Sequence, residues 1–416
     1  MVETEILVIR RVLIAEQGPL TEYLVRSLTH LGLETVVIVP NPPNPVSYAQ
    51  HATFTVQLSS STTDLKDALI EIANDAGCDG LHPGYSGLAE DIEFAQRVMR
   101  SNVKFIGPQL ELVFALSDRW TVREMAGAAG IPVSEAFGPI SSVSEISTCG
   151  DVLGFPLWVK DGAGRAPRMV KDHQQLSAEV ASRTCSGANA VWGERHIPRG
   201  RHVVASCVWE ERGDMVLSLR DRALRDEWGL SVDFVPAPVS EEVGKIIRSA
   251  ALGFGRTLGY RGIGSVGFMV DEDEAVVCIG FRSRLQVGDL LSDTYQGLNL
   301  AELQLRLAFG ENIGWSSEDL QPKGCSMAIR IHAVGHGIVT SLSVPDIAKF
   351  ETNIMEGHFA SGLLGVLIVS GTTRQAVLVK AVAALGEISI EGVETDVKDH
   401  IDAIANFSFW SDERIN

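Results

Sequence analysis

The segment CIGFRSRLQVGD, residues 278–289, places two arginines two positions apart, after apolar residues typical of the end of a β-strand. In a strand, that spacing puts Arg282 and Arg284 on the same face of the sheet. Two guanidinium groups on one face can clamp a carboxylate or a phosphate through paired hydrogen bonds. The segment holds no carboxylate before Asp289, so it predicts an anion site without an evident metal ligand or general base.

A second basic site is predicted where the apolar run GFPLWVK ends at Lys160, just before the glycine-bearing segment DGAGRAPRM. A lysine next to mobile glycines can cover the phosphates of a nucleotide. An ordinary surface turn with a solvent-exposed lysine explains the pattern about as well, and both interpretations stay open.

The histidines give weaker signals. His332 and His336 have the i, i+4 spacing of a metal-binding pair on a helix, but Gly335 disfavours a helix there. Two ordinary polar histidines are therefore the preferred interpretation. His82, in the LHPGY loop, is expected to fix that loop by hydrogen bonds.

The elements that would position these residues begin with alternating strands and helices. Apolar runs at residues 6–15 and 34–40 predict buried strands, and residues 21–32 between them predict a helix with leucines on one stripe. This βαβ unit indicates a parallel sheet. A helix at 64–78 and a strand before His82 continue the alternation.

A change of pattern follows. A helix is predicted at residues 110–129, and the segments 201–224 and 264–281 each predict an antiparallel hairpin, turning at Arg212-Gly213-Asp214 and at the acidic run DEDE. A lysine-bearing glycine loop above an antiparallel sheet is typical of an ATP-grasp module. The apolar strand GLLGVLIVS and the helix TRQAVLVKAVAALGEI then predict a third, α+β unit.

Composition limits the classes of function. The 416 residues are 45% hydrophobic, enough for two or three domains with their own cores. The net charge of -18, from 53 acidic and 35 basic residues, argues against a nucleic-acid partner because the phosphate backbone would be repelled. Six scattered cysteines without a C-x-x-C pair indicate reduced thiols and a cytoplasmic location. The acidic start is unlike a signal peptide, and no apolar run reaches membrane-spanning length, so no membrane partner is expected.

Several longer motifs resemble the biotin carboxylase subunit of acyl-CoA carboxylases, an ATP-grasp family. They occur in the same order along nearly the whole chain: LIAEQGP for the family's LIANRGE, LHPGYSGLAEDIEFA for HPGYGFLSENADFA, GYRGIGSVGFMVDEDE for GYVGAGTVEFLLDEDG, RSRLQVGD for NTRLQVEH, and EGVETDV for DGIKTNV. The resemblance implies an α/β and α+β fold with a Rossmann-like N-terminal domain at 1–108, an ATP-grasp domain at 109–310 and a C-terminal α+β domain at 311–416. A lid subdomain is expected at about 131–205.

The resemblance also implies that the catalytic groups are missing. In that family two glutamates and an asparagine hold magnesium at the ATP phosphates, and another glutamate deprotonates bicarbonate. The matching metal positions here are Gly267, Gly280 and Arg282, and the matching base position is Gly288. Leu230 stands where the family has a lysine. No metal site and no intact catalytic residue are therefore expected.

The anion pocket is expected to survive. By the same resemblance, the bicarbonate and biotin pocket keeps these residues: Arg282, Arg284, Gln286, Val287 and Arg330. The alternative is that the arginines are surface cations that pair with the acidic excess. Arg282 either neutralises phosphate without magnesium or fills the emptied metal cavity with a salt bridge, and both interpretations stay open.

The nucleotide side is partly retained as well. Its expected contacts, again from the resemblance, are Arg119, Lys160, Glu194, Arg195, Ile197, His202 and Val393. The family's longer glycine lid is shortened here, and Pro167 removes flexibility and an amide donor from it. ATP binding is therefore expected to be weak and independent of magnesium.

These features favour a non-catalytic biotin carboxylase homologue that acts as a structural or regulatory subunit of an acyl-CoA carboxylase assembly. The expected partners are a second copy or an intact biotin carboxylase, with biotin carboxyl carrier or carboxyltransferase subunits beyond them. One alternative is an active ATP-dependent carboxylase or ligase that recruited new metal ligands, such as Asp271, Asp273 or Asp289. Another is a sensor that binds nucleotide, bicarbonate or acyl-CoA without turnover.

Overall fold

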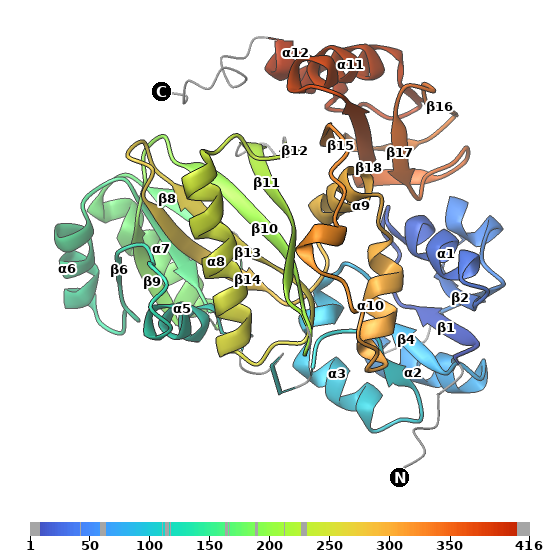
Figure 1. Cartoon of the computed structure of the whole chain (residues 1–416), viewed down its shortest axis with the longest axis horizontal. Helices are drawn as coiled ribbons and strands as arrows, with labels where there is room; N and C mark the ends of the chain where they lie inside the picture. Colours follow the sequence, from blue (N-terminus) through green and yellow to red (C-terminus); the bar gives the residue numbers. More distant parts are fainter. Residues whose placement is uncertain are drawn as a thin grey trace.

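The protein is described by a computed structural model (Figure 1). The described residues are 9–41, 43–58, 64–109, 111–112, 116, 118–162, 165, 167–187, 190–211, 213–225 and 231–405.

The N-terminal part is a parallel five-stranded sheet between helices. Its strand order is β3-β2-β1-β4-β5, and all four neighbouring pairs are parallel, as predicted. Leu24 and Leu28 pack with Val12 on one face, while Leu13 packs with Phe94 on the other. The elements are β1 (Arg11–Ile14), α1 (Thr21–His30), β2 (Glu34–Val39), η1 (Ser47–Gln50), β3 (Phe54–Gln57), α2 (Leu65–Asp75), β4 (Gly80–His82), η2 (Gly87–Glu90), α3 (Ile92–Met99) and β5 (Lys104–Phe105).

A small antiparallel sheet follows and lies at the opposite end of the molecule from the N-terminal sheet (Figure 1). Its strand order is β6-β9-β7-β8. The elements are α5 (Arg119–Ala128), β6 (Ala136–Phe137), α6 (Val143–Leu153), β7 (Leu157–Asp161), β8 (Arg168–Val170), α7 (His173–Cys185) and β9 (Val191–Arg195).

The predicted continuous helix from Leu110 to Ala129 is wrong. Asp118 has an extended backbone (φ -100°, ψ 111°), and its side chain accepts hydrogen bonds from the N–H groups of Trp120 and Thr121. An aspartate that satisfies the first free amides of a helix favours a helix start at that point. The helix α5 therefore begins at Arg119.

An eight-stranded sheet forms the centre of the molecule, in the order β14-β13-β10-β11-β12-β15-β18-β17. Both predicted hairpins are confirmed, because β10 pairs antiparallel with β11 and β13 with β14. Arg212, in the first predicted turn, lies outside the described residues. The elements are β10 (Arg201–Trp209), β11 (Met215–Arg225), β12 (Ser231–Val235), α8 (Glu241–Thr257), β13 (Gly262–Val270), β14 (Val276–Arg282), β15 (Cys325–Ile338), β17 (Lys349–Thr352) and β18 (Phe359–Gly371).

The two faces of this sheet differ. Val203, Ala205 and Cys207 of β10 pack against α8, which lies across that face (Figure 1). Because side chains alternate along a strand, His202 and Ser206 lie on the opposite face, with Gly267 of β13 next to His202. The positions of the expected metal and base therefore belong to the face away from α8.

The C-terminal part continues the same sheet. Val232 of β12 pairs with Ile329 of β15, so the sheet crosses the expected boundary between residues 310 and 311. The three-part division into domains remains a prediction. The predicted C-terminal strand lies within β18, and the predicted helix is α11. The remaining elements are η3 (Val287–Asp289), α9 (Leu290–Gln296), α10 (Leu300–Ala308), η4 (Ser317–Asp319), β16 (Ser341–Ser343), α11 (Arg374–Glu387), β19 (Ser389–Glu391) and α12 (Val397–Ala405).

Candidate functional site

The two expected metal positions face each other in the sheet. Gly267 of β13 is the register partner of Gly280 of β14, and a bulge at Ile279 follows directly. Side chains on directly opposed residues lie roughly 5 Å apart at Cβ, close enough for two carboxylates to share a metal. A Cβ at Gly267 would lie 3.4 Å from Nε2 of His202, whereas a Cβ at Gly280 would meet no described atom within 4 Å.

The expected base position is filled by another side chain. A Cβ on Gly288 would lie 2.2 Å from Nη1 and 2.5 Å from Cζ of Arg220. Arg220 is fully buried, and it pairs with Asp233 at 2.8 Å and with Asp289 at 3.2 Å. A guanidinium group held on two carboxylates therefore packs against the backbone of Gly288.

The candidate replacement metal ligands are engaged in internal contacts. Buried Asp289 accepts hydrogen bonds from Ser206 Oγ at 2.6 Å and from the Gln286 N–H at 2.7 Å, besides its pairing with Arg220. Asp271 accepts bonds from the N–H groups of Asp273 and Ala275 and so closes the hairpin tip. The described residues contain no group of three or more His, Cys, Asp or Glu side chains that could hold a metal ion.

Arg284 does not share a strand face with Arg282, so that prediction is wrong. The strand β14 ends at Arg282, the register partner of Ser265 in β13, and the chain then bends. Arg284 donates to the Tyr85 carbonyl at 2.7 Å and to Glu90 Oε2 at 3.0 Å. It therefore fastens the expected anion segment to the loop that follows β4.

Arg330 is also paired within the chain. It forms an ion pair with Asp233 at 3.0 Å and donates to Ser231 Oγ. Burial opposes ionisation of Asp233, but the surrounding guanidinium groups outweigh it and hold the pKa of Asp233 well below its ordinary value. Gln286 donates to Ser265 Oγ, and Val287 begins the turn η3.

The nucleotide cations have internal partners too. Nζ of Lys160 on β7 lies 2.6 Å from Oε1 of Glu194 on β9, and both side chains are largely buried. Arg195, the next residue, is half-exposed and pairs with Glu135 at 2.8 Å. The structure thus brings Lys160 and Glu194 together as neighbours on adjacent strands.

Two described residues of the segment after Lys160, Asp161 and Arg165, have partners within the chain. Asp161 is fully buried and accepts bonds from Arg165 at 2.8 Å and from Arg183 of α7 at 2.6 Å. Arg119 donates to the Arg165 carbonyl at 3.3 Å. Burial opposes ionisation of Asp161, but the hydrogen bond from Arg183 prevails and lowers its pKa.

The expected apolar walls of the adenine slot are not in one cluster. Val393 packs with Val339, Ile354 and Leu364 in the C-terminal part. Ile197 lies instead beside Gly200, at the start of β10. Leu230 lies outside the described residues, so its expected position in the site has no structural account.

The histidines have the roles expected of ordinary polar residues. Nδ1 of His82 accepts a bond from the Gly84 N–H at 2.9 Å, and Nε2 contacts Gln304 at 3.0 Å, which confirms the loop-fixing role. Burial lowers the pKa of His82 to about 4. His332 and His336 both lie in strand β15. His332 forms a hydrogen bond with Asp396, whereas the ring of His336 contacts the ring of Phe359.

Sequence reasoning missed Arg220 and Asp233. Both are fully buried, and together with Asp289 and Arg330 they link three adjacent strands to η3. The signal was the charged run RDR inside a predicted strand, because a strand interior carries full charges only when partners are nearby.

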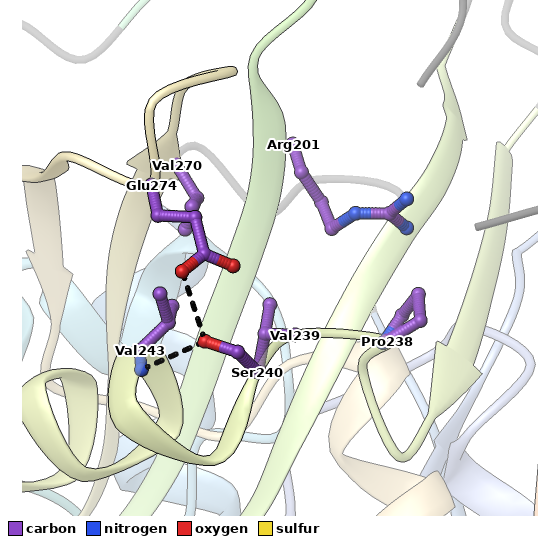
Figure 2. A pocket seen from close by; sticks show the side chains of 7 residues that line it. All are labelled: Arg201, Pro238, Val239, Ser240, Val243, Val270 and Glu274. Atoms are coloured by element: carbon purple, nitrogen blue, oxygen red, sulfur yellow. Dashed lines mark hydrogen bonds between the residues drawn. The ribbon is translucent and has the colours of Figure 1, made fainter. Parts of the chain in front are cut away.

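A pocket of about 310 Å³ lies elsewhere (Figure 2). Arg201 stands on one side of it, and on the other Ser240 Oγ lies between the Val243 N–H and Glu274, at 3.3 and 3.2 Å. Arg201 is the neighbour of His202 on β10 and points to the α8 face. This pocket therefore does not coincide with the expected nucleotide or anion site.

Comparison with known proteins identifies the family. The family model for the biotin carboxylase N-terminal domain matches residues 8–113, and the model for the ATP-binding domain of the carbamoyl-phosphate synthase L chain matches residues 118–315. Biotin carboxylase 2 of Bacillus subtilis is 26% identical over 433 residues, covering 96% of both proteins. The chain belongs to the biotin carboxylase family.

Solved structures of this family share the fold. The biotin carboxylase domain dimer of Hydrogenobacter thermophilus 2-oxoglutarate carboxylase, solved with MgADP, ADP and bicarbonate, matches with a TM-score of 0.91 at 22% identity. It covers 98% of this chain and 96% of that one. A Campylobacter jejuni biotin carboxylase complex matches with a TM-score of 0.90 at 23% identity. The match covers 98% of this chain and 97% of that one. The predicted ATP-grasp fold class is confirmed.

No helix within the described part of the chain combines the length and apolar character needed to cross a bilayer.

Proposed function

We propose that this biotin carboxylase homologue is catalytically inactive and acts as a structural or regulatory subunit of an acyl-CoA carboxylase assembly in the cytoplasm. The observation that carries the proposal is the pair Gly267 and Gly280. These directly opposed positions, where the resemblance expects two metal carboxylates, have no side chains. Phosphoryl transfer depends mainly on metal and positioned charge, so little catalysis is expected without them.

The base position supports the same proposal. The Arg220 guanidinium occupies the space beside Gly288, and nearby Asp289 is bound to three donors. Loss of a general base alone typically lowers a rate by roughly 10²–10⁴-fold. Asp289 could not replace that base without leaving Arg220 partly unpaired in the interior.

Assembly is the role that remains. The described parts of the chain have well-formed buried cores, although glycines stand at the expected metal and base positions. A retained scaffold with a vacated site favours a role in association. We propose pairing with a second copy or with an intact biotin carboxylase, and contact with carrier or carboxyltransferase subunits through that assembly.

A weak nucleotide site is the second part of the proposal. Lys160 and Glu194 are retained side by side, and a nucleotide would have to separate their 2.6 Å ion pair in order to bind the lysine. Binding is therefore expected to be weak, and unchanged by magnesium because no carboxylate pair is present to hold the metal.

Two measurements test the proposal separately. Bicarbonate-dependent ATP hydrolysis should be negligible beside an authentic biotin carboxylase assayed in parallel, and activity within tenfold of that enzyme would disprove the loss of catalysis. Light scattering together with affinity capture of the carboxylase subunits from the native cell should yield a dimer or a mixed complex. A strictly monomeric protein that captures none of them would favour the sensor alternative.

A further inference from the structure

The carboxylates beside the vacated base position are arranged like bound anions. Asp233 on β12 lies between Arg220 of β11 and Arg330 of β15, at 2.8 and 3.0 Å. Asp289 approaches Arg220 from η3 at 3.2 Å. Both carboxylates and Arg220 are at most 1% exposed. Each acid therefore meets an arginine in a site closed to solvent.

The packing leaves no room for an additional anion next to Gly288. Nη1, Cζ and Nε of Arg220 would all lie within 2.9 Å of a Cβ placed there. The carboxylate of Asp289 is in turn fixed by Ser206 Oγ and by the Gln286 N–H. Nη1 and Nη2 of this enclosed guanidinium group are paired with Asp233 and Asp289, whereas its buried Nε has no hydrogen-bond partner among the described residues.

The same arrangement recurs at other basic residues expected to bind anions. Arg284 pairs with Glu90 at 3.0 Å, and Lys160 pairs with Glu194 at 2.6 Å. The glutamate is largely buried in the second pair and partly buried in the first. Internal carboxylates at successive basic positions indicate one common feature of the site.

We propose that Asp233 and Asp289 serve as built-in anions, which occupy Arg220 and Arg330 and keep the pocket closed to bicarbonate and other small carboxylates. They also join strands β11, β12 and β15 and the turn η3 into one buried ion cluster. The cluster follows from the contacts alone and is independent of whether the chain assembles with a carboxylase.

Chemical rescue of Asp289→Ala tests the proposal. At constant ionic strength, replacing chloride by formate or bicarbonate should leave the melting temperature of the wild type unchanged. Asp289→Ala should melt several degrees lower, because Arg220 loses a buried partner. Formate, which matches the deleted carboxylate, should then recover much of that loss in a concentration-dependent way.

Ser206→Ala is the matched control. It removes a hydrogen bond to Asp289 but keeps the carboxylate, so its melting temperature should fall without any response to formate. A wild type stabilised by bicarbonate as strongly as the Asp289→Ala protein would overturn the proposal. A folded Asp289→Ala protein indifferent to both anions would overturn it as well.

A double-mutant cycle gives an answer if Asp289→Ala does not fold. Gly288→Ala should lower stability because its methyl group meets the Arg220 guanidinium. In an Arg220→Lys background, which keeps the charge but shortens the head group, the same change should have a clearly smaller effect. Equal effects in both backgrounds would show that Arg220 does not fill this space, and the proposal would fail.

Discussion

The two halves of the expected site, the metal half at Gly267 and Gly280 and the base half at Gly288, differ in what surrounds their glycines. In the metal half, Gly267 and Gly280 face each other, and a side chain at Gly280 would begin in open space among the described residues. In the base half, a Cβ at Gly288 would lie 2.2 Å from a buried guanidinium group. The first half has kept its space, whereas the second is packed around an ion cluster.

This difference predicts two responses to a new side chain. Space beside a strand can accept a new side chain with little change elsewhere. A close-packed and charge-paired interior cannot, because each guanidinium and carboxylate there depends on its neighbours. Gly267 in the metal half should therefore tolerate substitution better than Gly288 in the base half. Gly280 has space for a side chain, but its φ of 158° would strain the backbone of any other residue.

The largest effect is expected for Asp233→Ala. The substitution leaves the fully buried Arg220 and the largely buried Arg330 with one carboxylate fewer. Breaking a buried ion pair on one side typically costs about 3–5 kcal/mol. Urea unfolding should show that loss, with the transition midpoint moved to lower urea.

Asp233→Asn is the control for Asp233→Ala. It keeps the shape and one acceptor oxygen, so it should cost less than alanine but still lower the midpoint. A midpoint unchanged by both substitutions would mean that the cluster contributes nothing to stability, and the contrast between the two halves would lose its energetic basis.

A second acid, the partly buried Asp293, tests whether the arginines are what keeps Asp233 ionised. Asp293 accepts hydrogen bonds from the Tyr23 hydroxyl and from the Leu300 N–H, both neutral donors. Burial raises the pKa of Asp293 from 3.8 to about 7. The two aspartates thus shift in opposite directions, because Asp233 is surrounded by guanidinium groups.

The sign of the resulting pH dependence is definite. Between the ordinary aspartate pKa and about 7, folded Asp293 keeps a proton that the unfolded chain has lost, so stability falls as the pH rises. At roughly 1.4 kcal/mol for each pKa unit, the fall reaches up to about 4 kcal/mol. Urea unfolding at about pH 5 and about pH 8 should show roughly 3 kcal/mol of this fall, because about two of the pKa units lie between pH 5 and 7.

Asp293→Asn is the control for the pH effect, because asparagine does not titrate. The difference in stability between the two pH values should shrink in this variant. If wild type and variant lose the same amount of stability as the pH rises, Asp293 is not the titrating group.

Alanine at two glycines compares the halves directly. Gly288→Ala must displace the head group of Arg220, and such overpacking typically costs about 1–3 kcal/mol. Gly267→Ala meets only Ile279 and His202, at 3.3 and 3.4 Å, and should cost less than about 1 kcal/mol. The two values should come from urea unfolding under identical conditions. A larger loss of stability for Gly267→Ala than for Gly288→Ala would contradict the conclusion that the metal half has free space and the base half is closely packed.

Much of the fold could be predicted from the sequence because its patterns are local. The alternation of apolar runs gave the parallel N-terminal sheet, and turn residues gave both hairpins. The start of α5 could not be fixed by periodicity, because the cap at Asp118 competes with helix continuation. The continuity of the central sheet through β12 and β15 was also hidden, since pairing between strands distant in sequence leaves no local pattern.

The site was less predictable than the fold. Motif matching indicated which segments to compare, and the structure brings Gly267 next to Gly280 and Lys160 next to Glu194. It could not show that Arg284 lies beyond the strand end, because strand ends depend on tertiary contacts. Nor could it reveal the partners of the buried Arg220, which lie on the adjacent strand β12 and in the turn η3.

A modest effect, and the sharpest distinction, should come from placing carboxylates in the metal half. Gly267→Glu combined with Gly280→Glu places two acids on register partners, roughly 5 Å apart at Cβ, and manganese prefers such oxygen ligands. With free Mn²⁺ at about ten times its Kd, binding should add roughly 1.4 kcal/mol, seen as a higher melting temperature that chelator reverses. The wild type should not respond, and neither should either single variant, because one carboxylate holds the ion only weakly. A double variant that folds but ignores Mn²⁺ would show that the metal half has also been rebuilt, and the contrast with the base half would then be wrong.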